Sequence, residues 1–428
     1  MNAQQFHDIF NKLPAKRKEY LLLYLAGKSR DEIMLQLGLK DPTNMTHHLR
    51  NACKNFGIIP EAYTDYLYEL VELFSKYKPE IISPVLLKNL GFIVDQPPYP
   101  DIPDHIKSPF FITPKSLQNF NQLLHKPGII KIKAPHKMGK TSCINRIIAE
   151  AEKQQYQTVY LNLSVVEKEQ YQDIKSFYQS FFDIIISELP ELNLSIEWPA
   201  DSSKNTKCTE YLQKILTQLK TPLVLILDEV DKVFDYPIIY QDFFSMLRNW
   251  HEKGTRSKNW EKLRLIVSYS TDDYGRLDIH QSPFNVGTPI TLQELNEEEV
   301  KTLTSRHGLT QDTGITLMKL VGGHPYLLRL ALYELYYEHT TLNELQKNAP
   351  TNTGIYKEHL LYYLKFLQEN QDLKEVFKTI LDSFIPIKLR EKTIAIYQLE
   401  AMGLIKLVGD SVEIRCRLYR LYFSDRLG

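Results

Sequence analysis

Residues 134–141 read Ala-Pro-His-Lys-Met-Gly-Lys-Thr, between an apolar run at 128–133 that predicts a strand and a helical pattern that begins at Lys140. The octet matches the phosphate-binding pattern G-x-x-x-x-G-K-[ST], except that Ala134 replaces the first glycine. Such a loop turns its backbone amides toward phosphate oxygens, and Gly139 lets the backbone approach them closely. The helix that follows points free N–H groups and its positive dipole end at the same anion. The stretch therefore predicts an α/β fold with a phosphate site at a strand end.

The loop supplies candidate ligands for a nucleotide and for Mg²⁺. Lys140 places a cation near the β- and γ-phosphates, and the Thr141 hydroxyl suits Mg²⁺. Ala134 should cost little if its φ angle stays negative, because its side chain is small. The alternative is an ordinary strand–loop–helix connection in which glycine and lysine serve turning and solubility. The expected nucleotide-binding residues are Ala134, Pro135, His136, Lys137, Met138, Gly139, Lys140, Thr141 and Ser142.

A second element is an apolar strand that ends in acids, since residues 223–229 read Leu-Val-Leu-Ile-Leu-Asp-Glu. A central strand of this kind puts its carboxylate beside the phosphate loop. We expect Asp228 to hold Mg²⁺ and Glu229 to orient or deprotonate an attacking water. Alternatively, the two acids only end the strand and cap the next helix. The catalytic candidates are Lys140, Asp228 and Glu229, and the metal candidates are Thr141 and Asp228.

Weaker candidates follow nearby. A strand expected at 263–269 leads into Ser270, Thr271 and Asp272, where a hydroxyl could sense the γ-phosphate from a neighbouring strand end. Such residues also terminate ordinary strands. Asp231 is expected to be an exposed helix-capping acid.

The alternation of strands and helices predicts a P-loop NTPase parallel sheet. Its strands are expected at 128–133, 157–163, 223–227, 263–269 and 289–292, with a long helix at 167–189. Helices at 297–307, 312–321 and 326–337 would form a lid, and a hairpin at 404–408 and 412–415 suggests a winged helix. The predicted domains are a helix-turn-helix domain at 1–58, a helical segment with a proline-rich linker at 59–108, a P-loop core at 109–292, a helical lid at 293–370 and a winged helix at 371–428.

Composition limits the class of protein. With 52 basic and 52 acidic residues in 428, the chain is not a globally basic nucleic-acid binder. The amino-terminal residues lack a signal-peptide pattern, and no apolar run is long enough to predict a membrane span, so we expect a cytoplasmic protein without a membrane partner. Reduced thiols are expected because the cysteines are far apart, at Cys53, Cys143, Cys208 and Cys416.

Residues 1–58 predict an all-α helix-turn-helix domain. Ser29 and Glu32 have the spacing of a capping box, with Gly38 as a stop, and Asp41-Pro42 predicts the start of the next helix. On that helix, one face carries Met45, Leu49, Ala52 and Phe56. Nine Lys or Arg residues against five acids suit a duplex contact, although a protein-binding domain is the alternative. The candidate DNA contacts are Thr43, Asn44, His47, Arg50, Asn51 and Lys54.

From about residue 109 to the end, the chain resembles the AAA-like ATPases common in cyanobacteria, a family allied to the STAND signalling ATPases. In that family the loop usually carries Arg-Gln where this chain has His136-Lys137, a departure that leaves the phosphate-cradling backbone intact. The resemblance rests on Ser108-Pro109-Phe110-Phe111, residues 132–142, residues 225–231, Trp250-His251-Glu252-Lys253, residues 281–287 and residues 321–327.

The resemblance implies ATP or ADP with Mg²⁺ as ligand. Gly323-His324-Pro325 is similar to the Gly-x-Pro motif of the STAND lid, so Pro325 and His324 would close over the nucleotide; a plain helix start is the alternative. The winged helix would then be a latch for the ADP state. Residues 1–58 resemble LuxR-type DNA-binding domains and the helix-turn-helix domains that precede cyanobacterial AAA-like modules.

These resemblances imply a slow ATPase switch in signalling, transcriptional regulation or defence. Its output would pass through residues 1–58 to DNA or to an effector or signalling protein, and it could form a nucleotide-dependent oligomer. The alternatives are a DNA-acting ATPase of the replication or transposition type, and a nucleotide-gated scaffold without turnover. Arg276 and Arg329 are arginine-finger candidates, although a finger can come from a neighbouring protomer.

Overall fold

The computed structural model describes residues 2–38, 43–59, 66–78, 81–83, 86, 87, 90, 96–101, 103, 108–114, 117, 120, 124–192, 194, 204–270, 286–388 and 393–427. The chain forms two compact units. One comprises Met1–Tyr99, Glu298–Thr316 and Leu332–Thr340, and the other comprises Pro100–Glu297, Leu317–Ala331 and Thr341–Gly428. The boundaries of the five domains expected from the sequence stay a prediction.

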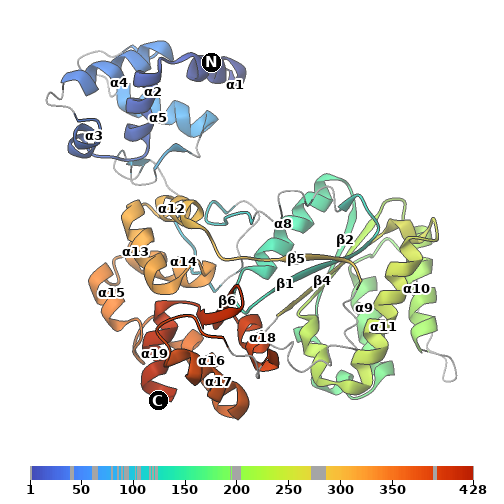
Figure 1. Ribbon diagram of the computed structural model, residues 1–428. Coiled ribbons are helices and arrows are strands. Elements are labelled where there is room, and N and C mark those ends of the chain that lie inside the picture. The colour runs from blue at the N-terminus through green and yellow to red at the C-terminus, as the bar shows by residue number, and fades with distance from the viewer. Residues whose placement is uncertain are drawn as a thin grey trace. The chain divides into compact units, whose positions relative to one another are not determined.

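The larger unit is built on a five-stranded parallel sheet with the order β2-β3-β4-β1-β5 (Figure 1). All six residues of β3 are buried, and seven of the eight residues of β4 are buried. Full burial fits strands that are covered on both faces, and the predicted α/β class is confirmed. The strands are β1 (Gly128–Ala134), β2 (Gln157–Asn162), β3 (Leu223–Asp228), β4 (Leu263–Ser270) and β5 (Thr288–Thr291).

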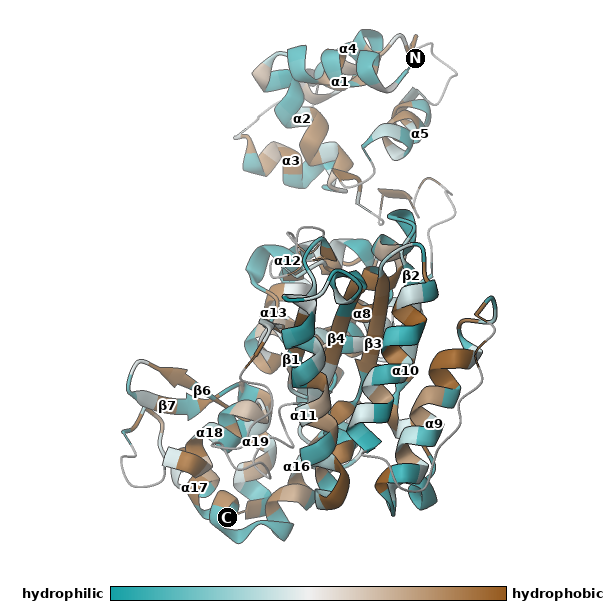
Figure 2. Cartoon of the chain, turned by 90° about the vertical axis from the view of Figure 1, so that its right-hand side faces the viewer, coloured by the Kyte–Doolittle hydropathy of each residue, from teal (hydrophilic) through white to brown (hydrophobic). Residues whose placement is uncertain are grey.

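Helices cover the two faces of this sheet through the alternating side chains of its strands. Val224 and Ile226 pack into the cluster that includes α8 (Lys140–Lys153). Leu225 and Leu227 pack into the opposite cluster, and β3 and β4 are among the most hydrophobic segments of the chain (Figure 2). The helices of that second cluster are α9 (Ile174–Ser187), α10 (Lys204–Gln218) and α11 (Pro237–Gly254).

The prediction of one helix over residues 167–189 is wrong at its start. Two short 3-10 helices, η3 (Leu163–Val165) and η4 (Lys168–Tyr171), precede α9. The helix α9 begins only at Ile174, because the Asp173 carboxylate caps it by accepting the N–H groups of Lys175 and Ser176 at 2.9 and 3.0 Å.

The helix α11 is tied to the strand that leads into the phosphate loop. Nδ1 of His251 accepts the backbone N–H of Ile129 at 3.2 Å. The neighbouring Trp250 is fully buried and donates its ring N–H to the Thr209 hydroxyl at 3.1 Å. His251 therefore fixes the start of β1, and Trp250 anchors α11 to α10.

After the sheet the chain is mostly helical. The predicted hairpin forms, since β6 pairs antiparallel with β7 and Val408 faces Ser411 across the turn. Ile387 adds a bridge to Val412, so α17, α18 and the hairpin follow the element order of a winged helix, with α19 after it. The elements are α12 (Glu297–Arg306), α13 (Gln311–Val321), α14 (Pro325–Tyr336), α15 (Leu342–Asn348), α16 (Lys357–Glu369), α17 (Gln371–Leu381), α18 (Thr393–Ala401), β6 (Ile405–Val408), β7 (Ser411–Ile414) and α19 (Arg417–Leu427).

The amino-terminal part of the smaller unit is all helical. The capping box predicted at Ser29 forms, with the Ser29 N–H donating to Glu32 at 2.7 Å and the Glu32 N–H donating back at 3.3 Å. Met45, Leu49, Ala52 and Phe56 are buried as predicted. Asp41 and Pro42 lie outside the described residues. The helices are α1 (Ala3–Lys12), α2 (Ala15–Leu25), α3 (Arg30–Gln36), α4 (Thr43–Asn55) and α5 (Tyr66–Tyr77).

None of the helices in the described part of the chain combines the length and apolar character needed to cross a membrane. The four cysteines are free thiols, of which Cys53, Cys143 and Cys208 are buried. Among the described residues, no group of three or more His, Cys, Asp or Glu side chains is placed to hold a metal ion.

Candidate nucleotide-binding site

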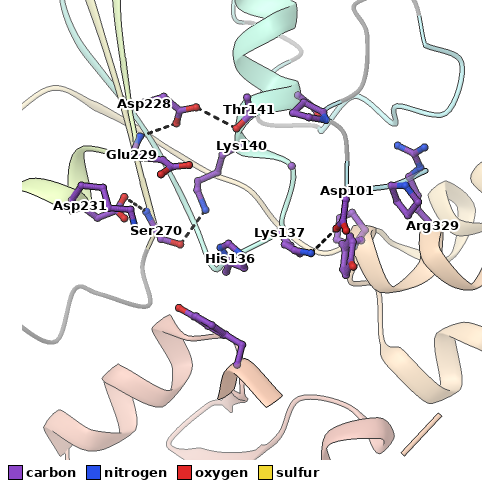
Figure 3. Close-up of a pocket in the computed structure, with 18 residues that line it drawn as sticks. Asp101, His136, Lys137, Lys140, Thr141, Asp228, Glu229, Asp231, Ser270 and Arg329 are labelled. Carbon is purple, nitrogen blue, oxygen red and sulfur yellow. Dashed lines mark hydrogen bonds and ion pairs between the residues drawn. The ribbon is translucent and has the colours of Figure 1, made fainter. Parts of the chain in front are cut away.

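A cavity of about 420 Å³ lies in the larger unit, at the carboxyl ends of β1, β3 and β4 (Figure 3). This volume falls within the range of small-molecule sites. Four parts of the chain line it. They are the loop and the start of α8 (His136, Lys137, Gly139, Lys140, Thr141, Ser142), the ends of β3 and β4 with the 3-10 helix that follows β3 (Asp228, Glu229, Asp231, Lys232, Ser270), the segment before β1 (Pro100, Asp101, Pro103), and α14 with α16 (Pro325, Tyr326, Arg329, Tyr362).

The loop has the backbone expected of a phosphate cradle. Gly139 adopts a φ of +88° and directly precedes α8, whose first residue is Lys140. Ala134 is the last residue of β1, so its backbone is extended and the condition set for this replacement of glycine is met. Lys137 adopts a φ of +59°, which costs a side-chain-bearing residue about 1–2 kcal/mol. The loop is thus held in a strained shape at Lys137, beside the cavity that it lines.

The Lys140 ammonium lies beside the first residues of the loop. Its ammonium donates to the carbonyl oxygens of Ala134 and Pro135 at 3.2 and 3.0 Å, and to the Ser270 hydroxyl at 3.2 Å (Figure 3). The loop therefore brings its lysine together with the hydroxyl at the end of β4. A role for this hydroxyl in sensing the γ-phosphate stays a prediction.

Asp231 was expected to be exposed, and this is wrong. Its side chain is only 6% exposed, and its carboxylate accepts the backbone N–H of Ser270 at 2.9 Å. A buried carboxylate needs such donors, so Asp231 fixes the end of β4. Thr271, Asp272 and Arg276, together with residues 281–285, lie outside the described residues.

Asp228 is the most constrained acid in the cavity wall. It is 1% exposed, and its Oδ2 atom accepts the hydroxyls of Thr141 at 3.2 Å and Tyr160 at 3.0 Å. Its Oδ1 atom accepts the backbone N–H of Glu229 at 3.0 Å. The structure thus brings together the predicted Thr141–Asp228 pair, and a hydroxyl beside a carboxylate is a donor set that a hard cation such as Mg²⁺ prefers. Glu229 lines the same cavity, with a φ of +52°.

Tyr160 was missed by the sequence reading. It lies on β2, and its Cα partner on β3 is Ile226, two residues before Asp228. Side chains two apart on a strand share a face, so the register could have identified it, but register between distant strands is not visible in the sequence. Burial, together with the nearby charge of Asp228, raises the pKa of the Tyr160 phenol, which therefore stays a donor at neutral pH.

Three successive loop residues contact three elements outside the sheet. His136 stacks on Tyr362 of α16 with ring centroids 5.3 Å apart, and desolvation in the cavity wall, with the charges of Lys140 and Lys137, lowers its pKa to about 4. Lys137 pairs with Asp101 at 2.6 Å, and its ammonium lies 4.0 Å from the ring centroid of Tyr326 on α14. Each partner lies in the larger unit.

The third contact joins the loop to the turn between α18 and β6. Gly403 in that turn has a φ of +77°, and a Cβ atom there would lie 3.1 Å from Cγ of Pro135. The predicted phosphate loop thus lies against α14, α16 and the turn between α18 and β6.

Several expected ligands contribute no side chain to the cavity wall. Ala134 and Met138 are buried in the core beneath α8. His324 was expected over the nucleotide, but it is 4% exposed, does not line the cavity and lies 5.2 Å from the ring of His359. The His324 ring accepts the Leu327 N–H at 3.5 Å and so caps the start of α14. The next residue, Pro325, does line the cavity.

Arg329 also lines this cavity. It is 7% exposed, and its guanidinium carbon lies 5.9 Å from the ring centroid of Phe110. This places one of the two arginine-finger candidates in the same wall as the lid residues.

The candidate DNA contacts lie on α4 of the smaller unit. His47, Arg50 and Lys54 are exposed, and Asn51 is hydrogen-bonded to His47 at 2.9 Å. The Arg50 guanidinium lies 5.7 Å from the ring centroid of Tyr66. Thr43 and Asn44 belong to α4, but their side chains are outside the described set.

Comparison with known proteins agrees with this fold. A family profile described as an AAA-like domain matches residues 99–425. Among solved structures, a Walker-type ATPase of Pyrococcus abyssi superposes with a TM-score of 0.53 at 11% identity, over 74% of this chain and 100% of that one. The ORC2 protein of Aeropyrum pernix, in its ADPNP–ADP complexes, gives a TM-score of 0.45 at 13% identity, over 75% of this chain and 97% of that one.

A comparison with curated proteins found no match. The profile match spans well over half of the chain and includes both the phosphate loop and the strand-end acid. The protein therefore belongs to the AAA-like domain family, with the fold of a P-loop ATPase.

Proposed function

We propose that this protein is a nucleotide-controlled switch of the STAND type, which binds ATP with Mg²⁺ in the cavity and hydrolyses it slowly. One observation carries the proposal: residues 135–137 of the phosphate loop contact α14, α16 and the turn between α18 and β6. A loop that only held a nucleotide would not need contacts to three elements outside the sheet. Such contacts are what a device needs to report the state of its phosphates.

The chemistry follows from the residues of the cavity. Thr141 and Asp228 would hold Mg²⁺, which neutralises phosphate charge when bound. Lys140, now on two carbonyls and the Ser270 hydroxyl, is within reach of the same phosphates. Glu229 is the candidate that orients or deprotonates water, and Arg329 is the candidate cation from the lid side.

Switching requires that the nucleotide prefer one position of the lid over another. A phosphate in the loop would compete for Lys137, which is paired with Asp101 and lies over Tyr326. It would also press on Pro135, against which Gly403 is packed. ATP and ADP can therefore differ in their effect on α14 and on the winged helix.

We further infer that the output passes through residues 1–58, to DNA or to a signalling or effector protein. Exposed Arg50 and Lys54 on α4 are the candidate DNA contacts. A nucleotide-dependent oligomer belongs to the same proposal. So does a cytoplasmic location, because four free cysteines suit a reducing compartment.

A DNA-acting ATPase is the main alternative, with the winged helix on the duplex. The helix α18 argues against it, because its sequence Thr-Ile-Ala-Ile-Tyr-Gln-Leu-Glu-Ala contains no lysine or arginine. It instead exposes Ile394 and Tyr397, at 66% and 57%. Phosphate contacts depend on basic side chains, so this face suits a protein better than DNA.

Calorimetry with ATP, ADP and GTP on the purified chain tests the proposal. We expect uptake of an adenine nucleotide, and Lys140→Ala should abolish it. Absence of any nucleotide binding by the wild-type protein would overturn the proposal.

Phosphate release separates a switch from a scaffold. Slow release by the wild type that Glu229→Gln abolishes supports turnover at this site, whereas equally negligible release by both supports a nucleotide-gated scaffold. A DNA-binding assay with Arg50→Ala/Lys54→Ala then tests the output: ATP-dependent DNA binding that survives the double substitution supports the DNA-acting alternative.

A further inference from the structure

We propose that Tyr160 is a positioning residue for Mg²⁺, whose phenol holds the Asp228 carboxylate in the orientation that lets it share the cation with Thr141. The proposal rests on the proposed function, because it assumes that Mg²⁺ and a nucleotide occupy the cavity. It assigns a task to a strand, β2, none of whose residues lines the cavity itself.

The placement of Tyr160 follows from the pairing of β2 with β3. Asn162 is the Cα partner of Asp228, and Tyr160 is the partner of Ile226. Ile226 and Asp228 are two apart and face α8, as does Tyr160, which packs against the same cluster. The phenol therefore crosses from one strand to the next and ends 3.0 Å from Oδ2 of Asp228.

The three donors to Asp228 differ in whether they would also bind the cation. The Thr141 hydroxyl, 3.2 Å from Oδ2, must turn its lone pair to the metal in order to act as a ligand. It can keep its O–H on Oδ2 while it does so, because a hydroxyl has two lone pairs besides its hydrogen. The other two donors, the Tyr160 hydroxyl on Oδ2 and the Glu229 N–H on Oδ1, take no part in binding the cation. The backbone N–H is fixed in every variant, so Tyr160 is the side-chain donor that holds Oδ2 without itself being a ligand of the cation.

The low exposure of Asp228, at 1%, makes this donor hard to replace. A buried carboxylate that loses a donor has no ready access to solvent and adopts whichever orientation recovers a partner. Hydrogen bonds to metal-binding carboxylates orient them, and their loss typically lowers metal affinity by about 10- to 100-fold. Phenylalanine at position 160 removes the donor and keeps the ring.

The test is a Mg²⁺ titration of the full-length protein with a fluorescent ADP analogue (N-methylanthraniloyl-ADP), starting in EDTA. Tyr160→Phe should bind the analogue in EDTA as the wild type does, but should need about tenfold more Mg²⁺ to reach half of the metal-dependent change. Thermal melting of the same samples shows that both are folded. An unchanged Mg²⁺ requirement in folded Tyr160→Phe overturns the proposal.

Tyr171→Phe is the matched control. Tyr171 is buried, and like Tyr160 it donates its hydroxyl, at 2.6 Å, but to the carbonyl oxygen of Leu163 and not to the acid. Its Mg²⁺ requirement should equal that of the wild type. If both variants raise the requirement equally, Tyr160 has only a structural role and the proposal fails.

A double-mutant comparison separates positioning from a direct effect. In an Asp228→Asn background, Tyr160→Phe should change the Mg²⁺ requirement no further, because the group it positions has been altered. Full additivity of the two substitutions overturns the proposal. Tyr160→Leu, which also lacks the donor, provides the same test with the same expected shift should the phenylalanine variant not fold.

Failure of this inference can be told from failure of the proposed function. If neither the wild type nor any variant binds the analogue, with or without Mg²⁺, the proposed function is wrong and this inference falls with it. If all bind and share one Mg²⁺ requirement, only the role of Tyr160 is wrong.

Discussion

Pro135 of the phosphate loop occupies the space into which a side chain on Gly403 would project, at 3.1 and 3.2 Å from the position of its Cβ atom. The turn between α18 and β6 is thus in direct contact with the residue that follows β1. This contact is the one through which we propose that a shift of the loop reaches the turn.

Gly403→Ala should lower the free energy of unfolding by about 1–3 kcal/mol, because the φ of +77° strains any side chain and the methyl group also meets Pro135. Gly409→Ala is the matched control, since Gly409 has a φ of +60° and no neighbouring atom within 4 Å of its Cβ position. Chemical denaturation measures both, and calorimetry should show weakened nucleotide binding only for Gly403→Ala. Equal effects of the two substitutions on nucleotide affinity would refute the contact as a coupling element.

Two substitutions of Lys137 separate the effect of its backbone strain from the effect of its side-chain contacts. Lys137→Ala and Lys137→Gly both remove the pairing with Asp101 and the contact with Tyr326, but only glycine relieves the φ of +59°. We expect the glycine variant to be more stable than the alanine variant by about 1 kcal/mol. Thermal melting checks this order, and an alanine variant as stable as the glycine variant would show that the loop backbone is not strained.

Asp231→Ala should destabilise the protein by about 1–3 kcal/mol, because it leaves the Ser270 N–H without its buried acceptor. It should also weaken nucleotide binding, since Lys140 donates to the Ser270 hydroxyl. Asp235→Ala is the control on the same 3-10 helix, η5 (Val230–Asp235), where Asp235 is exposed. Matching melting temperatures for the two variants would contradict the role given to Asp231.

His324 predicts a pH dependence of stability. Burial, with the nearby charge of Arg415, lowers its pKa to about 3, and burial holds the pKa of His359 well below its ordinary value of 6.5. The unfolded chain therefore binds protons that the folded chain does not, so stability is full above about pH 6.5 and falls as the pH decreases below it.

His324→Asn should reduce this slope, because asparagine can still cap α14 but does not titrate. Melting temperatures between about pH 7 and pH 5 measure it for both proteins. Slopes that coincide would mean that His324 does not contribute to the acid sensitivity.

The sequence was a good guide where one segment decides the outcome. The apolar runs placed β1 to β5 to within a residue or two, and the loop octet, with Asp228 and Glu229 on the next-but-one strand, identified the cavity. These features depend on local order, namely a run of buried side chains that ends in polar ones. The capping box of Ser29 and Glu32 could also be predicted from the sequence, because it needs only two residues three apart.

It was a poor guide where the partner lies on another strand or helix. Tyr160 reaches Asp228 through the register of β2 against β3, which no single segment encodes. Asp231 reaches the N–H of Ser270 from the 3-10 helix η5, and that contact depends on how this helix packs against the end of β4. In the motif Gly323-His324-Pro325, Pro325 lines the cavity but His324 does not. The His324 ring packs against His359 instead, a contact that the motif does not predict. The helix expected at 167–189 starts late because the hydrogen bonds of Asp173 outweigh the helical pattern before it.

The strand order has one last implication. Because β4 stands between β1 and β3, the backbones that carry the lysine loop and the acid are held two strand spacings apart, about 9–10 Å. That interval is set by main-chain hydrogen bonds, which every amino acid except proline can make. Side chains on the outer helices are therefore free to drift over evolutionary time without altering the span between the two chemical groups, which accounts for a shared architecture at 11% identity.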